Sequence, residues 1–229
     1  MGLFTSSSVE KESNKAAQIL NGFISKKKIP TEAIQNAKGI AIFSAIRGGM
    51  WVAGSGGSGI VVARLPDGSW SPPSAFSVRS GGVGIVWGVD MYDCVLLLNT
   101  DAAVTAYSKS ESNLGGGVAL AAGPAGWNGE KGEQKPVWTY TKSRGLYGGL
   151  TVDGTVIKER LDANEAFYGG KVSATQILRG QVKERSGLNV WPQGATQLIE
   201  VLKLAEGKVG DKKVLQGIST EPTPGDLED

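Results

Sequence analysis

Residues 37–75 read AKGIAIFSAIRGGMWVAGSGGSGIVVARLPDGSWSPPSA, and this stretch decides the fold. Its glycines at 54, 56 and 59 have the G-x-G-x-x-G spacing of a dinucleotide loop, but IVVARL at 60–65 and Pro-Asp-Gly at 66–68 follow them. A nucleotide loop must open a helix, since the helix N-terminus holds the pyrophosphate. A β-branched run closed by Pro-Asp-Gly instead predicts a strand that enters a tight hairpin. We therefore predict a glycine-rich strand, a loop, a second strand and a hairpin, and no nucleotide site.

The composition limits the chemistry available to this chain of 229 residues. It has no histidine, which excludes Ser-His-Asp triads, histidine general bases and H-E-x-x-H metal sites. Cys94 is its only cysteine, so no intramolecular disulfide or cysteine zinc cluster can form, and we expect this thiol to be buried. The carboxylates that could act in catalysis each have a structural role at hand; they are Asp90, Asp93, Asp101, Asp153, Glu159, Asp162 and Glu165. We predict that the protein is not an enzyme and uses no cofactor and no metal.

Periodicity predicts a mainly β, α+β fold. Ser7 and Glu10 form a capping box for an amphipathic helix over 9–27, and a short helix starts at Pro30 and ends at Gly39. Strand patterns cover 40–43, 60–65, 83–89, 92–98, 118–122, 137–142, 146–152 and 155–160. The last three strands form an antiparallel meander if Arg144-Gly145 and Asp153-Gly154 are turns. Further short helices are predicted at 101–108, 164–168 and 173–178.

These elements fit one domain: an antiparallel β barrel or sandwich with an N-terminal amphipathic helix and short covering helices. We expect a flexible segment at 1–8, a domain over 9–206 with its core at about 30–180, and a C-terminal helix at about 195–206. The 34 glycines lack a collagen period and suit turns and close backbone approaches. Residues 217–229 combine Pro, Thr and acids without apolar spacing, which predicts an acidic disordered tail.

Several motifs resemble the SYLF domain in the order in which that family carries them. Besides the stretch at 37–75 they are LLNT at 97–100, AAGP at 121–124, YTKSRGLY at 140–147 and DANEAFYG at 162–169, so the resemblance runs from about residue 8 to 180. The resemblance implies a module that binds phosphoinositides and, in fungal members, actin filaments. Family members usually carry a Src-homology-3 domain or a FYVE zinc finger as well, and this sequence shows neither.

The charge is polarised along the chain. Residues 1–47 hold seven basic and three acidic side chains, whereas 217–229 hold four acidic side chains and no basic one. A helix with lysines beside an apolar face is typical of an interfacial helix, although a helix docked on a sheet with a solvated lysine edge has the same pattern. The K-x-x-x-K-A-A-x-I-L opening at 11–20 resembles the family's region for lipid and actin contact. The candidate lipid- and actin-binding residues are Lys11, Lys15, Ile19, Leu20, Phe23, Lys26, Lys27, Lys28, Arg47 and Trp51.

Together, these patterns predict a non-catalytic adaptor for phosphoinositide membranes and actin filaments at cortical or endocytic sites. An actin-bundling structural protein without direct lipid binding is the alternative. We predict no nucleic-acid partner, because the basic residues carry no motif that reads RNA or DNA. We expect a cytoplasmic, peripheral membrane protein at cortical actin structures, and Met1–Ser6 match the M-G-x-x-x-[ST] pattern for N-myristoylation at Gly2.

Overall fold

The computed structural model describes residues 8–109, 111–114, 136–182 and 193–226, and it leaves the side chains at 50–53, 82–87, 111–114 and 145–154 undescribed. Three long strands and one short one form the sheet: β1 (Gly39–Ala63), β2 (Ser74–Leu98), β3 (Glu111–Leu114) and β4 (Val137–Glu159). The helices are α1 (Val9–Ser25), α2 (Thr31–Asn36), α3 (Asp101–Ser108), α4 (Leu161–Tyr168), α5 (Ala174–Leu178), α6 (Thr196–Ala205) and α7 (Lys212–Gln216), with a 3-10 turn at Gln193–Ala195.

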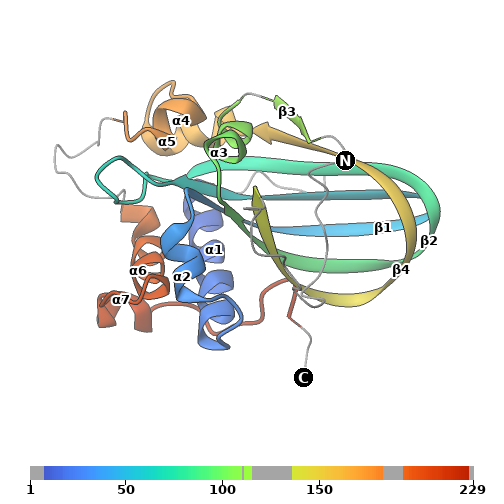
Figure 1. Ribbon diagram of the computed structural model, residues 1–229, viewed down its shortest axis with the longest axis horizontal. Coiled ribbons are helices and arrows are strands. Elements are labelled where there is room, and N and C mark those ends of the chain that lie inside the picture. The colour runs from blue at the N-terminus through green and yellow to red at the C-terminus, as the bar shows by residue number, and fades with distance from the viewer. Residues whose placement is uncertain (1–7, 110, 115–135, 183–192, 227–229) are drawn as a thin grey trace.

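All strand pairs are antiparallel, and the strand order is β1-β2-β4-β3. The helices gather at one end of the sheet, and the strands curve back at the other end (Figure 1). The predicted α+β class with an antiparallel sheet is confirmed. The sheet is not closed into a barrel within the described chain, because β1 and β3 remain its two edges.

The glycine-rich stretch is one continuous strand rather than two strands and a loop. β1 pairs with β2 from Gly39, opposite Leu98, to Val61, opposite Ser74, with an irregularity between Met50 and Val52. The strand reading is therefore confirmed, and no helix follows the three glycines. The predicted hairpin is also present: Leu65 N–H donates to Ser69 O at 2.8 Å.

β1 doubles back on itself, and two of its glycines make this possible. A Cβ atom on Gly59 would lie 2.5 Å from Cβ of Phe43, and one on Gly57 would lie 2.6 Å from Cβ of Ala45. Residues 43 and 59 would be about 50 Å apart in a straight strand. The two halves of β1 therefore pack backbone against backbone, which a side chain at either glycine would prevent.

Each face of the sheet has its own hydrophobic cluster. The outer face packs against α1, α2 and α6, and its cluster includes Ile40, Ile42, Ile60, Val95 and Leu97. The inner face is the one that the curved sheet encloses, and α3 packs against it. Its cluster includes Phe43, Val61, Phe76, Leu96 and Ile157. This division follows the alternation of side chains along a strand. Cys94 is fully buried in the inner cluster, as predicted, and burial raises the pKa of its thiol to about 12.

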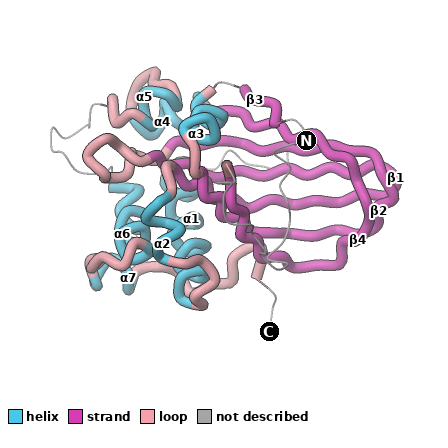
Figure 2. The backbone as a smooth tube through the Cα atoms, in the orientation of Figure 1, coloured by secondary structure: helices cyan, strands magenta, loops and turns pink. Residues whose placement is uncertain are grey.

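The predicted meander at 137–160 is wrong. Residues 137–159 form the single strand β4, whose pairing with β2 continues through both expected turns (Figure 2). Arg144 lies opposite Met91, and Asp153 lies opposite Gly82. The two X-Gly dipeptides are therefore part of an extended strand. The predicted strand at 118–122 lies outside the described residues.

The predicted short helices are present as α3, α4 and α5, and two of them have side-chain caps. Thr100 caps α3 by accepting a hydrogen bond from Ala103 N–H at 3.1 Å. Ser173 forms a capping box with Gln176 at the start of α5. At α1 the described cap is Ser8, which accepts from Lys11 N–H at 3.2 Å, while Ser7 lies outside the described residues. Among the described helices, none has the length and apolar character needed to cross a membrane.

The C-terminal segment differs from the expected disordered tail. The structure places the chain as far as Asp226, with Ile218 8% and Thr223 4% exposed. Gln18 of α1 donates its side-chain amide to the carbonyl of Glu221. Ile218 packs in the outer hydrophobic cluster, and hydrogen bonds hold the polar residues that follow it on the domain.

Candidate functional site

The apolar residues among the candidates form the buried side of α1. Ile19 and Leu20 are fully buried, Phe23 is 2% exposed, and all three belong to the outer cluster shared with the sheet and α6. Nζ of Lys142 lies 5.9 Å above the Phe23 ring centre. These three side chains therefore face the core and are not available to a partner while α1 is docked.

The lysine triplet lies at the end of the same helix and is exposed. Lys27 adopts the left-handed region with φ 51°, and its N–H donates to Ile24 O at 2.9 Å, while Lys28 N–H donates to Phe23 O at 2.9 Å. This arrangement ends α1 and satisfies its last carbonyl groups. Lys26, Lys27 and Lys28 all point away from the core as exposed side chains.

A surface groove of about 400 Å³ adjoins the triplet. Its lining comes from the end of α1, the start of α2 and the end of α6, and it consists of Ile24, Ser25, Lys27, Ile29, Pro30, Thr31, Leu204 and Ala205. Leu204 is 40% exposed, and Lys27 is exposed at the same groove. The groove thus combines a cationic side chain and two hydroxyls with an apolar wall.

The first two lysines of α1 differ from each other. Lys11 is exposed, whereas Lys15 is half-buried and its Nζ lies 2.8 Å from Oε2 of Glu12. Glu12 is fully buried, accepts a hydrogen bond from Ser58 Oγ at 2.6 Å and lies 4.0 Å from the Arg160 guanidinium. Lys15 therefore helps to neutralise a buried carboxylate that joins α1 to the sheet.

Arg47 is not part of the exposed lysine surface. Its guanidinium lies 2.7 Å from Oδ2 of Asp90 and stacks 5.1 Å from the ring centre of Tyr92. Asp90 is 2% exposed and Tyr92 belongs to the inner cluster, so Arg47 neutralises a carboxylate beside the core. The side chain of Trp51 lies outside the described residues. The structure therefore brings together Lys26, Lys27 and Lys28 but does not join Arg47 to them.

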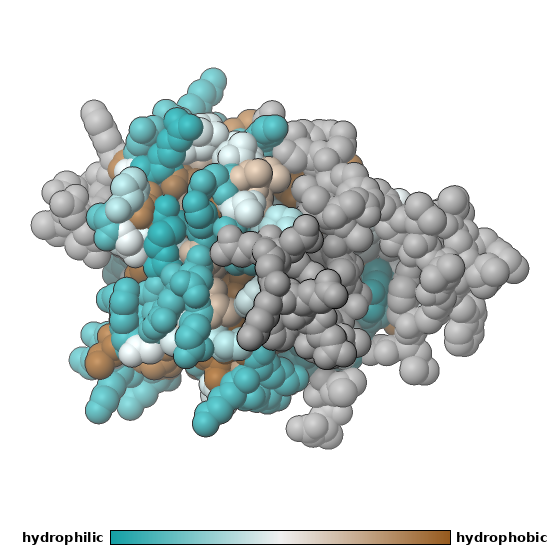
Figure 3. Space-filling model, in the orientation of Figure 1, coloured by the Kyte–Doolittle hydropathy of each residue, from teal (hydrophilic) through white to brown (hydrophobic). Residues whose placement is uncertain are grey.

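We call Lys26, Lys27 and Lys28 the basic edge; Lys11 lies at the other end of α1, about 22 Å away along the helix axis. The described part of the surface is mainly hydrophilic in the view of Figure 3, with smaller hydrophobic areas between the polar side chains. The basic edge fits this pattern, because its lysines are exposed while the apolar residues of α1 lie beneath them.

A polar network around Asp93 was missed by the sequence analysis. Asp93 is fully buried on β2; Ser44 Oγ donates to its Oδ1 at 2.6 Å, and Gly225 N–H donates to its Oδ2 at 3.0 Å. Thr223 Oγ1 also donates to Oδ2, and Lys142 Nζ lies 3.7 Å from it. Thr223 lies 130 residues from Asp93, so no local sequence signal could have paired them.

Two further candidate carboxylates, Asp101 and Glu159, have structural partners. Asp101 pairs with Lys38 at 2.9 Å. Glu159 accepts from the backbone N–H of Ala174 and from Asn164, and burial raises the pKa of its carboxyl. In the ranges that the structure describes, no group of three or more histidine, cysteine or acidic side chains could hold a metal ion.

Comparison with known proteins adds the family to this geometry. A family model named Ysc84, with the description "Las17-binding protein actin regulator", matches residues 79–205, which is more than half of the chain. The chain belongs to this family. The SYLF resemblance is thereby confirmed.

Relatives in fungi and mammals support the assignment. Protein YSC84 of Saccharomyces cerevisiae is 37% identical over 210 residues, which cover 86% of this chain and 43% of that protein. LAS seventeen-binding protein 3 of the same species is 38% identical over 77% of this chain and 41% of its own length. SH3 domain-containing YSC84-like protein 1 of Bos taurus is 40% identical over 86% of this chain and 59% of its own length.

This chain thus spans about half the length of the curated relatives that it matches. No solved structure matches it.

Proposed function

We propose that this protein is a non-catalytic adaptor that binds actin filaments and phosphoinositide membranes through its basic edge, at cytoplasmic cortical actin sites. The observation that carries the proposal is the exposed triplet Lys26–Lys28 beside an open groove. The family description as an actin regulator supports the actin partner. The membrane partner rests on the chemistry of the groove.

The groove suits a phosphorylated headgroup. Lys27 supplies positive charge, and the hydroxyls of Ser25 and Thr31 are hydrogen-bond donors along the same lining. Ile24 and Leu204 offer apolar contact for the part of a lipid next to its headgroup. Each lysine near an anionic membrane contributes about 1 kcal/mol, so the three lysines of the basic edge are worth roughly 3 kcal/mol before association costs.

Membrane contact in this proposal does not use the apolar residues of α1. Leu20 and Phe23 would have to leave the outer cluster before they could enter a bilayer. Burial of one such side chain stabilises a protein by about 1.5 to 3 kcal/mol. Because α1 is docked, this stabilisation is already present and would be lost if the helix left the sheet. Surface binding through the lysines therefore costs less than insertion of α1.

Actin binding would use the same charge. Filament surfaces are acidic, so a cluster of lysines raises the rate of encounter and makes binding sensitive to salt. A single basic edge on one chain binds one filament, and bundling would need a second site or a dimer. The Gly2 myristoylation pattern lies outside the described residues and stays a prediction.

The test compares two triple variants with equal net charge. Lys26→Gln, Lys27→Gln and Lys28→Gln remove the triplet, whereas the control replaces three exposed lysines on other elements, Lys109, Lys158 and Lys171, by Gln. Flotation with phosphatidylinositol bisphosphate vesicles and cosedimentation with filamentous actin should both weaken for the first variant and stay near wild type for the control.

Equal losses in the two variants would show that only net charge matters and would contradict the proposal. Loss of cosedimentation by the triplet variant, with no flotation of the wild type, would favour the actin-only alternative. Vesicles with phosphatidylserine at matched charge separate headgroup recognition from general attraction.

A further inference from the structure

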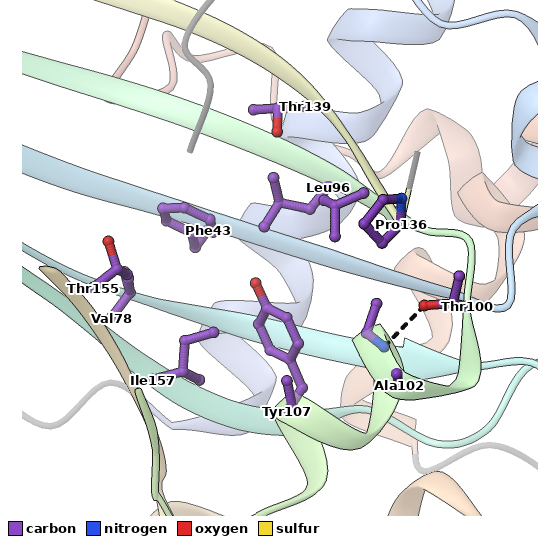
Figure 4. Close-up of a pocket in the computed structure, with 13 residues that line it drawn as sticks. Phe43, Val78, Leu96, Thr100, Ala102, Tyr107, Pro136, Thr139, Thr155 and Ile157 are labelled. Carbon is purple, nitrogen blue, oxygen red and sulfur yellow. Dashed lines mark hydrogen bonds between the residues drawn. The ribbon is translucent and has the colours of Figure 1, made fainter. Parts of the chain in front are cut away.

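A cavity of about 170 Å³ lies between α3 and the inner side of the folded sheet (Figure 4). Its lining is largely apolar and includes Phe43, Val78, Leu96, Ala106, Val137 and Ile157. Ala102 and Pro136 also line it and are exposed, so they mark its rim. The small side chains of Ala103 and Ala106 on α3 leave the space that larger residues would fill.

Four hydroxyl side chains line this space, and the one that comes from within α3 is Tyr107. Tyr107 of α3 is 4% exposed, and Figure 4 shows its hydroxyl between Phe43 and Leu96. No hydrogen bond joins this hydroxyl to another described residue, and it faces the space of the cavity. The ring is held edge-on to Phe76 with the ring centres 5.1 Å apart. Burial raises the pKa of Tyr107, so its hydroxyl is protonated at neutral pH and can donate.

The other hydroxyls of the lining belong to threonines. Thr100 Oγ1 accepts a hydrogen bond from Ala103 N–H as the cap of α3. Thr139 and Thr155 lie on β4, across the cavity from α3. Tyr107 thus extends a hydroxyl donor from α3 in among the apolar lining residues (Figure 4).

We propose that this cavity binds a small apolar group that carries one hydrogen-bond acceptor, with Tyr107 as the donor. Apolar cavities of about 150 Å³ stay dry and bind molecules of the size of benzene. An acceptor opposite Tyr107 would satisfy the hydroxyl, and the hydrocarbon part would fill the space between α3 and the sheet. An aromatic ester and the ester end of a short acyl chain share this chemistry.

This site is independent of the basic edge. The cavity belongs to the inner cluster, whereas the apolar side of α1 packs on the outer cluster. Ligand binding in the cavity can therefore be measured without lipid vesicles or actin.

The experiment titrates the full chain with four probes and follows the methyl resonances of Val78, Leu96 and Ile157 by NMR. Methyl hexanoate and methyl benzoate carry an acceptor, and hexane and benzene are their counterparts without one. We expect shifts in these resonances and about three- to tenfold tighter binding of the esters than of the hydrocarbons, the worth of one hydrogen bond. A preference for the chain or for the ring identifies the source of the ligand.

Two variants test the role of each part. Tyr107→Phe should lower the affinity for the esters to that of the hydrocarbons, while Tyr140→Phe on the other face of the sheet should leave all four affinities unchanged. Ala106→Leu should fill the cavity and abolish binding of every probe. If that variant unfolds, Ala103→Val serves the same purpose with a smaller volume change. Wild-type protein whose methyl resonances do not respond to any probe, or a Tyr107→Phe variant that keeps the preference for esters, would overturn the proposal.

Discussion

Thr223, close to the end of the chain, donates its hydroxyl to the buried carboxylate of Asp93 in β2. A carboxylate inside a sheet needs several donors, because an unpaired buried charge is costly. Asp93 obtains donors from Ser44 and from the backbone of Gly225, and Lys142 supplies the opposite charge. The C-terminal segment therefore completes the polar centre of the sheet.

Removal of the Thr223 hydroxyl should destabilise the protein. Thr223→Ala leaves Oδ2 of Asp93 with one donor fewer, and we expect the free energy of unfolding to fall by about 1 to 3 kcal/mol. Urea denaturation monitored by tryptophan fluorescence measures this change. Thr220→Ala is the matched control, because Thr220 is exposed, and it should stay within about 0.5 kcal/mol of wild type. Equal effects of the two substitutions would show that the network does not stabilise the domain.

Asp226 should make the free energy of unfolding depend on pH in the acid range. Partial burial raises its pKa, but hydrogen bonds from Lys142 and Thr223 and the charge of Lys142 outweigh that effect and hold the pKa at about 2, below the ordinary 3.8. A carboxyl whose pKa is depressed by folding stabilises the folded state above its unfolded pKa and loses that contribution as the pH falls. The contribution of Asp226 should therefore disappear between about pH 4 and pH 2.

Asp226→Asn isolates this effect. The difference in urea midpoint between wild type and variant should be largest above pH 4 and should shrink towards pH 2. A difference that stays constant over this range would assign the effect of the substitution to shape rather than to charge.

The folding of β1 on itself gives a third prediction. Gly59→Ala places a Cβ against Phe43 and the backbone before it, and overpacking of this kind costs about 1 to 3 kcal/mol or more. Gly56→Ala is the control from the same strand, because a Cβ there would have no neighbour within 4 Å. Thermal unfolding followed by circular dichroism should show a marked loss for the first variant and little change for the second. A Gly59→Ala variant as stable as Gly56→Ala would mean that the two halves of β1 are not in close contact.

Local patterns could predict those parts of the fold that depend on neighbouring residues. The caps at Thr100 and Ser173 and the turn before Ser69 depend on contacts over a few positions, and the sequence predicted all three elements. The length of β4 could not be predicted in this way. Asp153-Gly154 has the composition of a hairpin turn, yet β2 supplies pairing partners that keep this dipeptide extended. Glycines opposite it at 81 and 82 belong to a strand more than sixty positions earlier in the chain.

The candidate site, like the fold, could be predicted only where it depends on neighbouring residues. Helical periodicity separated the exposed lysines of α1 from Phe23 on its apolar side. Periodicity cannot tell whether an apolar side rests on a sheet or on a membrane, and packing with α6 decides this for Phe23. The ion pair of Arg47 with Asp90 follows from the register of β1 and β2, in which the two residues are opposite each other.

The last prediction concerns the buried Phe23 of α1, which stabilises the fold, and the exposed lysines after the helix, which we propose bind partners. Phe23→Ala empties a site in the outer cluster and should lower the free energy of unfolding by about 3 to 5 kcal/mol. Replacement of Lys26, Lys27 and Lys28 by Gln changes exposed side chains only and should leave it within about 0.5 kcal/mol per site. Chemical denaturation of both proteins measures the two values, and near-ultraviolet circular dichroism checks that the triple variant keeps its native packing. A large stability loss in the triple variant would show that the lysines stabilise the end of α1, and its binding defects would then no longer report on a surface for partners. A Phe23→Ala variant as stable as wild type would show that α1 is not anchored on the sheet by this ring, so that the helix would be free to detach.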